Sequence, residues 1–219
     1  QRRGADSDYS IDGEATTVSG RVFHALFLTL RKRDAEHAVQ SLIVPASEYH
    51  PSRRFRIQTA DTSLAIRFGR LIESALRGEL TAWAGDGAHA ALAQILLLDQ
   101  FTRNVFRNTP RAFAGDVLAL PAAQAMVARG DDQVLPPLRR LFAYLPFEHA
   151  EDPAMQLQSL RLFAALTAAD ASLASFEDYA RRHAEVIERF GRFPHRNAVL
   201  GRASTAEELA FLEQPGSRF

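Results

Sequence analysis

The chain has 219 residues, of which 47% are hydrophobic and 24% charged, and its 26 basic and 26 acidic side chains cancel in formal charge. This length and composition suit one sizeable globular domain, and the neutral balance argues against nucleic acid as a partner. Cysteine is absent, which excludes disulfides, thiolate catalysis and cysteine-ligated metal sites. Because no run of about 18 apolar residues occurs, we expect no membrane span, and we expect a cytoplasmic protein.

The N-terminal part differs from the rest of the chain. Residues 1–19 lack hydrophobic periodicity, which predicts a flexible tail ahead of a single all-helical domain over residues 20–219. Val22, Leu26 and Leu30 share one side of a helical projection, which predicts a helix over residues 20–44.

Helical spacing and capping signals define the next elements. One helix is predicted from Ser63 to Gly78 and a second over residues 89–105, whose centre is apolar nearly all round. The pair Thr109-Pro110 should start a third helix that ends at Gly130, and Pro121 should kink or divide it.

The remaining predicted helices carry the same kinds of signal. These are a short helix over 136–145 closed by Pro146, a helix capped by Asp152-Pro153, a helix from Ser175 to Gly191, and a last helix after the capping box Ser204–Glu207. No segment shows strand-like alternation with turn dipeptides. About eight helices with short connections therefore predict an all-α fold of packed antiparallel pairs.

The first polar motif is LLLDQFTRN, within the helix predicted over residues 89–105. Asp99 and Arg103 continue its apolar stripe four residues apart, and Gln100 and Asn104 lie four apart on the adjacent stripe. Charge on a buried stripe is costly unless it is paired. The motif therefore indicates either an internal ion pair that completes the helix or the floor of a polar pocket.

The second polar motif is YLPFEHAED, which brings Glu148 and His149 together ahead of Asp152. Asp152 is most simply a helix N-cap. His149 and Glu148 have the residue types of a general base or of half a metal site. No second histidine follows at helical spacing, so we predict a hydrogen-bonded or catalytic residue and no metal.

The third polar motif is GRFPHRN, after the helix that ends at Gly191. Arg192 and Arg196 can reach helix carbonyls or a carboxylate, while Phe193 and Pro194 anchor the loop in the core. The anchored loop then determines the direction of the His195 and Asn197 side chains. Such anchoring fits either preorganised binding or a structural role, and no hydrolase-elbow or nucleotide-loop pattern occurs.

Taken together, these motifs resemble the DUF924 family of bacterial proteins over roughly Arg67 to Leu212. The D-Q-F-x-R-N pattern of that family falls on Asp99–Asn104, its F-E-H-x-E-D pattern on Phe147–Asp152, and its G-R-F-P-H-R-N pattern on Gly191–Asn197. The resemblance implies an all-helical fold similar to the tetratricopeptide-repeat superfamily and gives no reaction. Upstream the match fades, so residues 1–60 are expected to be atypical.

Two functions fit these motifs. Helical-pair arrays generally present grooves to peptides or partner proteins, which favours an interaction module. The alternative is an enzyme or small-ligand binder for an anionic carboxylate or phosphate, with His149 and His195 as proton-transfer groups beside Glu148. No cofactor is indicated. The candidate ligand-binding residues are Asp99, Gln100, Arg103, Asn104, Arg192, Arg196 and Asn197.

Overall fold

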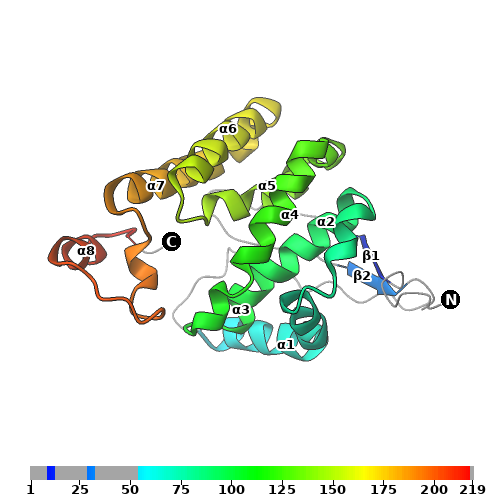
Figure 1. The fold of residues 1–219 in the computed structure, drawn as a ribbon, viewed down its shortest axis with the longest axis horizontal. Helices are drawn as coiled ribbons and strands as arrows, with labels where there is room; N and C mark the ends of the chain where they lie inside the picture. Colours follow the sequence, from blue (N-terminus) through cyan, green and yellow to red (C-terminus); the bar gives the residue numbers. More distant parts are fainter. Residues whose placement is uncertain (1–8, 13–28, 33–53, 218–219) are drawn as a thin grey trace.

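A computed structural model describes residues 9–12, 29–32 and 54–217, and most of this part of the chain is helical. Eight α-helices lie within these ranges (Figure 1): α1 (Arg54–Leu76), α2 (Ala88–Leu96), α3 (Thr102–Val105), α4 (Asp116–Arg129), α5 (Pro137–Glu148), α6 (Pro153–Ala169), α7 (Ala174–Phe190) and α8 (Ala206–Leu212). The predicted all-α fold is therefore confirmed.

Shorter helical turns connect the α-helices. The turn that carries Asp99 is η5 (Leu97–Phe101), a π-helical turn that joins α2 directly to α3. The others are 3₁₀ turns: η4 (Thr81–Gly85), η6 (Pro110–Phe113), η7 (Asp131–Val134), η8 (Ala171–Leu173) and η9 (Pro194–Arg196).

The β structure in the described ranges is one small ribbon. Strands β1 (Tyr9–Asp12) and β2 (Thr29–Lys32) pair antiparallel, with Ile11 opposite Leu30. The helix predicted over residues 20–44 is therefore wrong at β2. Three apolar positions do not separate a helix from a strand, and pairing with a second strand satisfies the same backbone groups as a helical turn. The rest of that prediction, and most of the predicted tail over 1–19, lies outside the described residues.

Two predicted helix ends are also wrong. Helix α1 begins at Arg54 rather than at Ser63, because the residues between them contain no proline or glycine that would stop a helix. Helix α5 continues through Pro146 to Glu148, since the His149 amide still donates to the Leu145 carbonyl at 2.9 Å. Pro146 removes a single backbone donor close to the helix end. Glu148 is thus held by a helix, not by a loop.

Other predicted helix features are confirmed in part. Thr109-Pro110 opens the 3₁₀ turn η6 instead of α4, which begins at Asp116. Helix α4 is not divided at Pro121, and it ends at Gly130 in a left-handed conformation with φ 73°. Asp152 caps α6 by accepting a hydrogen bond from the Ala154 amide at 2.7 Å. The predicted capping box is shifted by one residue, because it is Thr205 and Glu208 that exchange hydrogen bonds at the start of α8.

The helices enclose two main hydrophobic clusters. The larger lies among α2, α4, α5, α6 and α7, and the second packs α1 against η4 and η5. Helix α6 packs against α5, which precedes it, and against α7, which follows it. The π turn η5 lies at the junction of the two clusters, which is where Asp99 is found. In the part of the chain that the structure describes, no helix has the length and apolar character that crossing a membrane requires.

Candidate functional site

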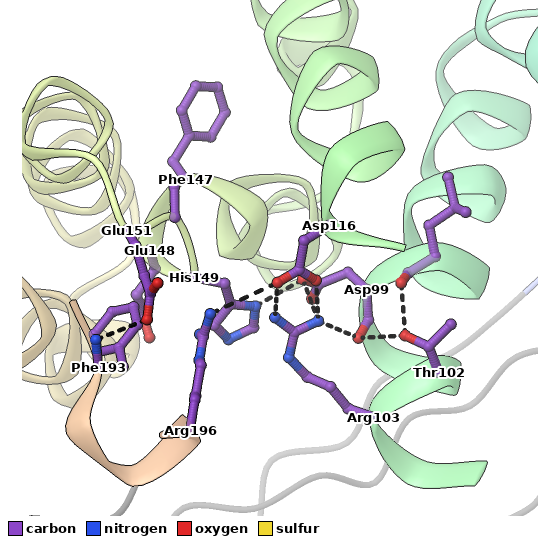
Figure 2. A network of polar contacts seen from close by, with 12 residues as sticks. Asp99, Thr102, Arg103, Asp116, Phe147, Glu148, His149, Glu151, Phe193 and Arg196 are labelled. Atoms are coloured by element: carbon purple, nitrogen blue, oxygen red, sulfur yellow. Dashed lines mark hydrogen bonds and ion pairs between the residues drawn. The ribbon is translucent and has the colours of Figure 1, made fainter. Parts of the chain in front are cut away.

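The three polar motifs predicted from the sequence meet at the end of helix α5 (Figure 2). His149 Nδ1 and Asp99 Oδ1 lie 2.7 Å apart, which joins the first motif to the second. Glu151 Oε1 accepts a hydrogen bond from the Phe193 amide at 2.8 Å, which joins the second motif to the third. Segments that are far apart along the chain therefore converge on one polar cluster between the helices.

Asp99 is the centre of this cluster, and its side chain is 1% exposed. Its Oδ1 contacts Arg103 Nη1 at 3.0 Å in addition to His149, and its Oδ2 accepts a hydrogen bond from Gln100 Nε2 at 2.6 Å. Burial raises the pKa of Asp99, but the positive charge of Arg103 and the contact with His149 outweigh this effect and lower the pKa overall. Asp99 is therefore ionised, and both of its oxygens accept hydrogen bonds.

The position of Asp99 depends on the π turn η5. A π turn inserts an extra residue into the helical winding, so every side chain after it is rotated from where a straight α-helix would place it. Thr102 Oγ1 donates to the Leu98 carbonyl at 2.6 Å and satisfies a backbone acceptor within this turn. The continuous helix predicted over residues 89–105 is thus interrupted at the residue that carries the buried charge.

Because an ionised carboxylate can only accept hydrogen bonds, the contact with Asp99 requires the proton of His149 to lie on Nδ1. Burial lowers the pKa of His149, and although the charge of Asp99 raises it, burial together with the positive charges of Arg103 and Arg196 leaves the pKa below its usual value. His149 is therefore neutral at neutral pH and has a lone pair on Nε2. Its side chain is 15% exposed.

Arg103 is held by two carboxylates. Its Nη1 and Nη2 donate to the two oxygens of Asp116 at 2.8 and 3.0 Å, and Nη1 also donates to the Asp99 carbonyl at 2.8 Å. Asp116 begins α4, next to Gly115, which packs directly against the Leu98 backbone. The Asp99–Arg103 pair follows from the helical spacing of the sequence, whereas no periodic signal marks Asp116 as a member of the cluster.

Arg196 is the least satisfied cation of the cluster. Its side chain is 6% exposed, its guanidinium lies 4.9 Å from the ring centroid of Phe113 and 4.4 Å from that of Phe193, and its Nη1 lies 3.7 Å from Asp116 Oδ2. This last distance is too long for a hydrogen bond. Within the described residues, Arg196 Nε is buried without a hydrogen-bond partner. Burial, with repulsion from Arg103, lowers the pKa of Arg196 to about 10.

A second buried acid–imidazole pair lies next to the first. Glu148 Oε1 and His183 Nδ1 are 3.2 Å apart, and the rings of His183 and His149 have centroids 6.2 Å apart. Burial, and then the charge of Asp99, raises the pKa of Glu148 to about 8, while burial lowers that of His183 well below its usual value. Glu148 was a predicted candidate. His183 was missed, although it follows Ala180 at helical spacing on the buried stripe of α7.

His195 lies at the edge of this group. Its ring centroid is 5.6 Å from that of Phe193, with an interplanar angle of 38°. Burial, followed by the positive charge of Arg196, lowers the pKa of His195 to about 4. His195 is therefore neutral at neutral pH, like His149 and His183.

Other candidates from the motifs lie in different contacts. Arg192 donates to both carboxylate oxygens of Glu208 at 2.7 and 2.8 Å, and Asn197 Nδ2 donates to Ser204 Oγ at 3.0 Å. These contacts tie the GRFPHRN loop to the start of α8. Asn104 Oδ1 accepts a hydrogen bond from Arg107 Nη2 at 3.2 Å, which is an exposed contact at the end of α3.

Glu151 fixes the loop that carries Arg196. Besides the Phe193 amide, it accepts hydrogen bonds from Arg202 Nη1 at 2.6 Å and Nη2 at 2.9 Å.

Across residues 9–12, 29–32 and 54–217, no three histidine, aspartate or glutamate side chains are grouped so as to hold a metal ion.

Comparisons with known proteins agree with the sequence motifs. A family model described as bacterial protein of unknown function (DUF924) matches residues 35–216. A solved structure of the protein of unknown function ATU0120 from Agrobacterium tumefaciens is 40% identical, with a TM-score of 0.67, and the match covers 77% of this chain and 89% of that chain. No curated protein matches the chain. The predicted resemblance is confirmed and extends upstream of Arg67, to residue 35.

Proposed function

The chain belongs to the DUF924 family of bacterial proteins, and we propose that it binds a small anionic molecule and moves a proton to or from that molecule through His149. One observation carries this proposal, namely the 2.7 Å contact between His149 Nδ1 and Asp99 Oδ1. A buried carboxylate that holds one imidazole nitrogen leaves the other as a directed base.

The Asp99–His149 pair has the properties that a proton-transfer group needs. Asp99 fixes the ring orientation and the tautomer, and it stabilises the imidazolium that forms when Nε2 takes up a proton. Because burial lowers the pKa of His149, the ring is free to accept a proton at neutral pH. Glu148, whose pKa is raised to about 8, carries a proton at the same pH and is the second group able to give one up.

The Arg196 guanidinium supports the anionic character of the ligand. It is buried, it makes no hydrogen bond through Nε to the described part of the chain, and its charge acts on His149. A buried donor of a charged group that lacks an acceptor costs about 1–3 kcal/mol or more. An anionic ligand group would supply the missing acceptor beside the base.

The same features favour this function over an interaction module. The incomplete pairing of Arg196 costs stability, in contrast to the two-point pairing of Arg103, and binding sites often retain such unfavourable local energies. The interaction-module function stays a prediction, since none of these contacts bears on a peptide or protein partner.

Calorimetric titration of the protein with propionate and with inorganic phosphate at pH 7 tests the proposal. We expect at least one anion to bind, with proton uptake that is visible as a difference between two buffers of unequal ionisation enthalpy, because an anion beside His149 raises its pKa. Arg196→Met should weaken binding by about tenfold or more, and His149→Gln should abolish the proton uptake.

Arg189→Met is the matched control, since Arg189 is a surface arginine with a side chain that is 49% exposed. It should bind the anions as the unmodified protein does. The proposal is wrong if neither anion binds, or if binding is the same in Arg196→Met, His149→Gln and Arg189→Met.

A further inference from the structure

Two aromatic rings lie close to the guanidinium of Arg196. The Phe113 and Phe193 rings lie 4.9 and 4.4 Å from it, one contributed by η6 and the other by the GRFPHRN loop. The N–H donors of a guanidinium all lie in its plane. A ligand that pairs with Arg196 must therefore approach in the plane of the group, beside these two aromatic rings.

One edge of Arg196 lacks an acceptor among the described residues. Its Nη1 is directed at Asp116, at 3.7 Å, and Asp116 is already engaged by both terminal nitrogens of Arg103. The Nε atom, which shares the opposite edge with Nη2, is buried and has no acceptor in the described residues. Two parallel N–H groups along one edge are the arrangement that binds a carboxylate in two-point fashion.

On the premise of the proposed function, we infer that the anionic group recognised at Arg196 is a planar carboxylate and not a phosphate. Two observations support this choice. The first is the planar geometry of the guanidinium and the apolar rings beside it. A carboxylate can place both of its oxygens in the guanidinium plane, whereas a tetrahedral phosphate also carries oxygens outside that plane, in surroundings that include the Phe113 and Phe193 rings.

The second observation is the charge balance around the edge. Arg103 and Arg196 face Asp99 and Asp116, so the positive and negative charges of these four side chains already cancel. A monoanion adds one negative charge, which protonation of the neutral His149 offsets. A phosphate dianion would add a second negative charge near two carboxylates in a largely buried place, which is unfavourable.

Three small probes of similar size test this inference: propionate, methylphosphonate and propionamide. Their affinities for the unmodified protein are measured by calorimetry at pH 8, where methylphosphonate is mostly a dianion. We expect propionate to bind at least about tenfold more tightly than either of the other probes. In Arg196→Lys, which keeps the charge and loses the planar edge, the preference for propionate over methylphosphonate should shrink to about twofold or less. Arg189→Lys should keep the full preference.

The possible outcomes separate the two proposals. If methylphosphonate binds as tightly as propionate and both depend on Arg196, the carboxylate inference is overturned and the proposed function stands. If neither anion binds, both the proposed function and the carboxylate inference are wrong. If propionamide equals propionate, the ligand is not selected by charge and the inference is wrong. Should Arg196→Lys fail to fold, the three affinities of the unmodified protein still decide the matter.

Discussion

Asp99 Oδ1 and His149 Nδ1 lie 2.7 Å apart although 50 positions separate the two residues in the sequence. The contact joins the π turn after α2 to the end of α5, and both partners are largely buried. Because Asp99 also contacts Arg103, one carboxylate orients an imidazole and compensates a guanidinium at the same time. The compensation of Arg103 and the orientation of His149 therefore depend on the same carboxylate.

Replacement of Asp99 by asparagine should lower the free energy of unfolding by about 2–4 kcal/mol in urea denaturation, because loss of one partner of a buried ion pair leaves the other uncompensated. The effect should lie at the lower end because Arg103 keeps Asp116. The control is Glu73→Gln, which removes the exposed pair with Arg111, with side chains 42% and 51% exposed, and should change the value by less than about 1 kcal/mol. Equal effects of the two substitutions would contradict the buried role of Asp99.

The contribution of Glu148 to the free energy of unfolding should fall as the pH rises. Its pKa is about 8 in the folded protein against 4.5 in an exposed glutamate, so between these values the folded carboxyl keeps a proton that the unfolded one has lost. Its contribution to stability is therefore complete below pH 4.5 and declines toward pH 8, by at most about 1.4 kcal/mol per pH unit.

Glu148→Gln has no such titration, so its stability relative to the unmodified protein should rise from pH 5 to pH 8. Urea denaturation at several pH values measures this difference in the free energy of unfolding. Burial lowers the pKa of His195 to about 4, so His195 makes stability rise with pH, but this contribution is the same in both proteins and cancels in the difference. Glu207→Gln, an exposed partner of Arg189, should show no such trend. A constant difference between the Glu148→Gln and unmodified proteins would show that Glu148 is ionised when folded.

Gly115 should not tolerate a side chain. A Cβ at this position would overlap the Leu98 carbonyl oxygen and lie 2.7 Å from the carbonyl carbon, and both are backbone atoms of the π turn. Gly115→Ala should therefore lower the free energy of unfolding by about 1–3 kcal/mol. At Gly69, in α1, an added methyl group would meet no atom within 4 Å, so Gly69→Ala should instead raise it by about 0.5–1 kcal/mol. A stabilising Gly115→Ala would mean that α4 and η5 are less closely packed.

Glu151 should hold the loop that carries Arg196. Glu151→Gln weakens the acceptor of the Phe193 amide and the pair with Arg202, so hydrogen exchange at the Phe193 amide should become faster. Stability should fall by about 1–2 kcal/mol, since hydrogen bonds to charged groups are worth somewhat more than neutral ones. Glu177→Gln, which breaks the exposed pair with Arg181, is the control and should leave exchange at Phe193 unchanged.

The sequence predicted several members of the cluster because the motifs carry strong local signals. Asp99 and Arg103 continue an apolar stripe, which is unfavourable unless they are paired, and the structure pairs them at 3.0 Å. Helix ends at Asp152, Gly130 and Gly191 were predictable for the same reason, since capping residues and left-handed glycines act over a few positions.

Features that depend on distant packing were not predictable in this way. The π turn at Leu97–Phe101 requires the neighbouring helices to compensate its irregular backbone, and nothing in LLDQF marks it. Helix α5 passes Pro146 because its last turn is buried against other helices, which outweighs the loss of one backbone hydrogen bond. Asp116 and Phe113 belong to the cluster through tertiary contacts alone.

The most direct test of the proposed proton transfer is the protonation state of His149, read from the ¹⁵N chemical shifts of its imidazole between pH 5 and 8. We predict a neutral ring at pH 7, with the proton on Nδ1 and a bare Nε2, and a pKa below the usual value near 6.5. In Asp99→Asn the preference for the Nδ1 proton should weaken. A doubly protonated ring at pH 7, or a proton on Nε2 with a bare Nδ1, would contradict the role of His149 as a base oriented by Asp99.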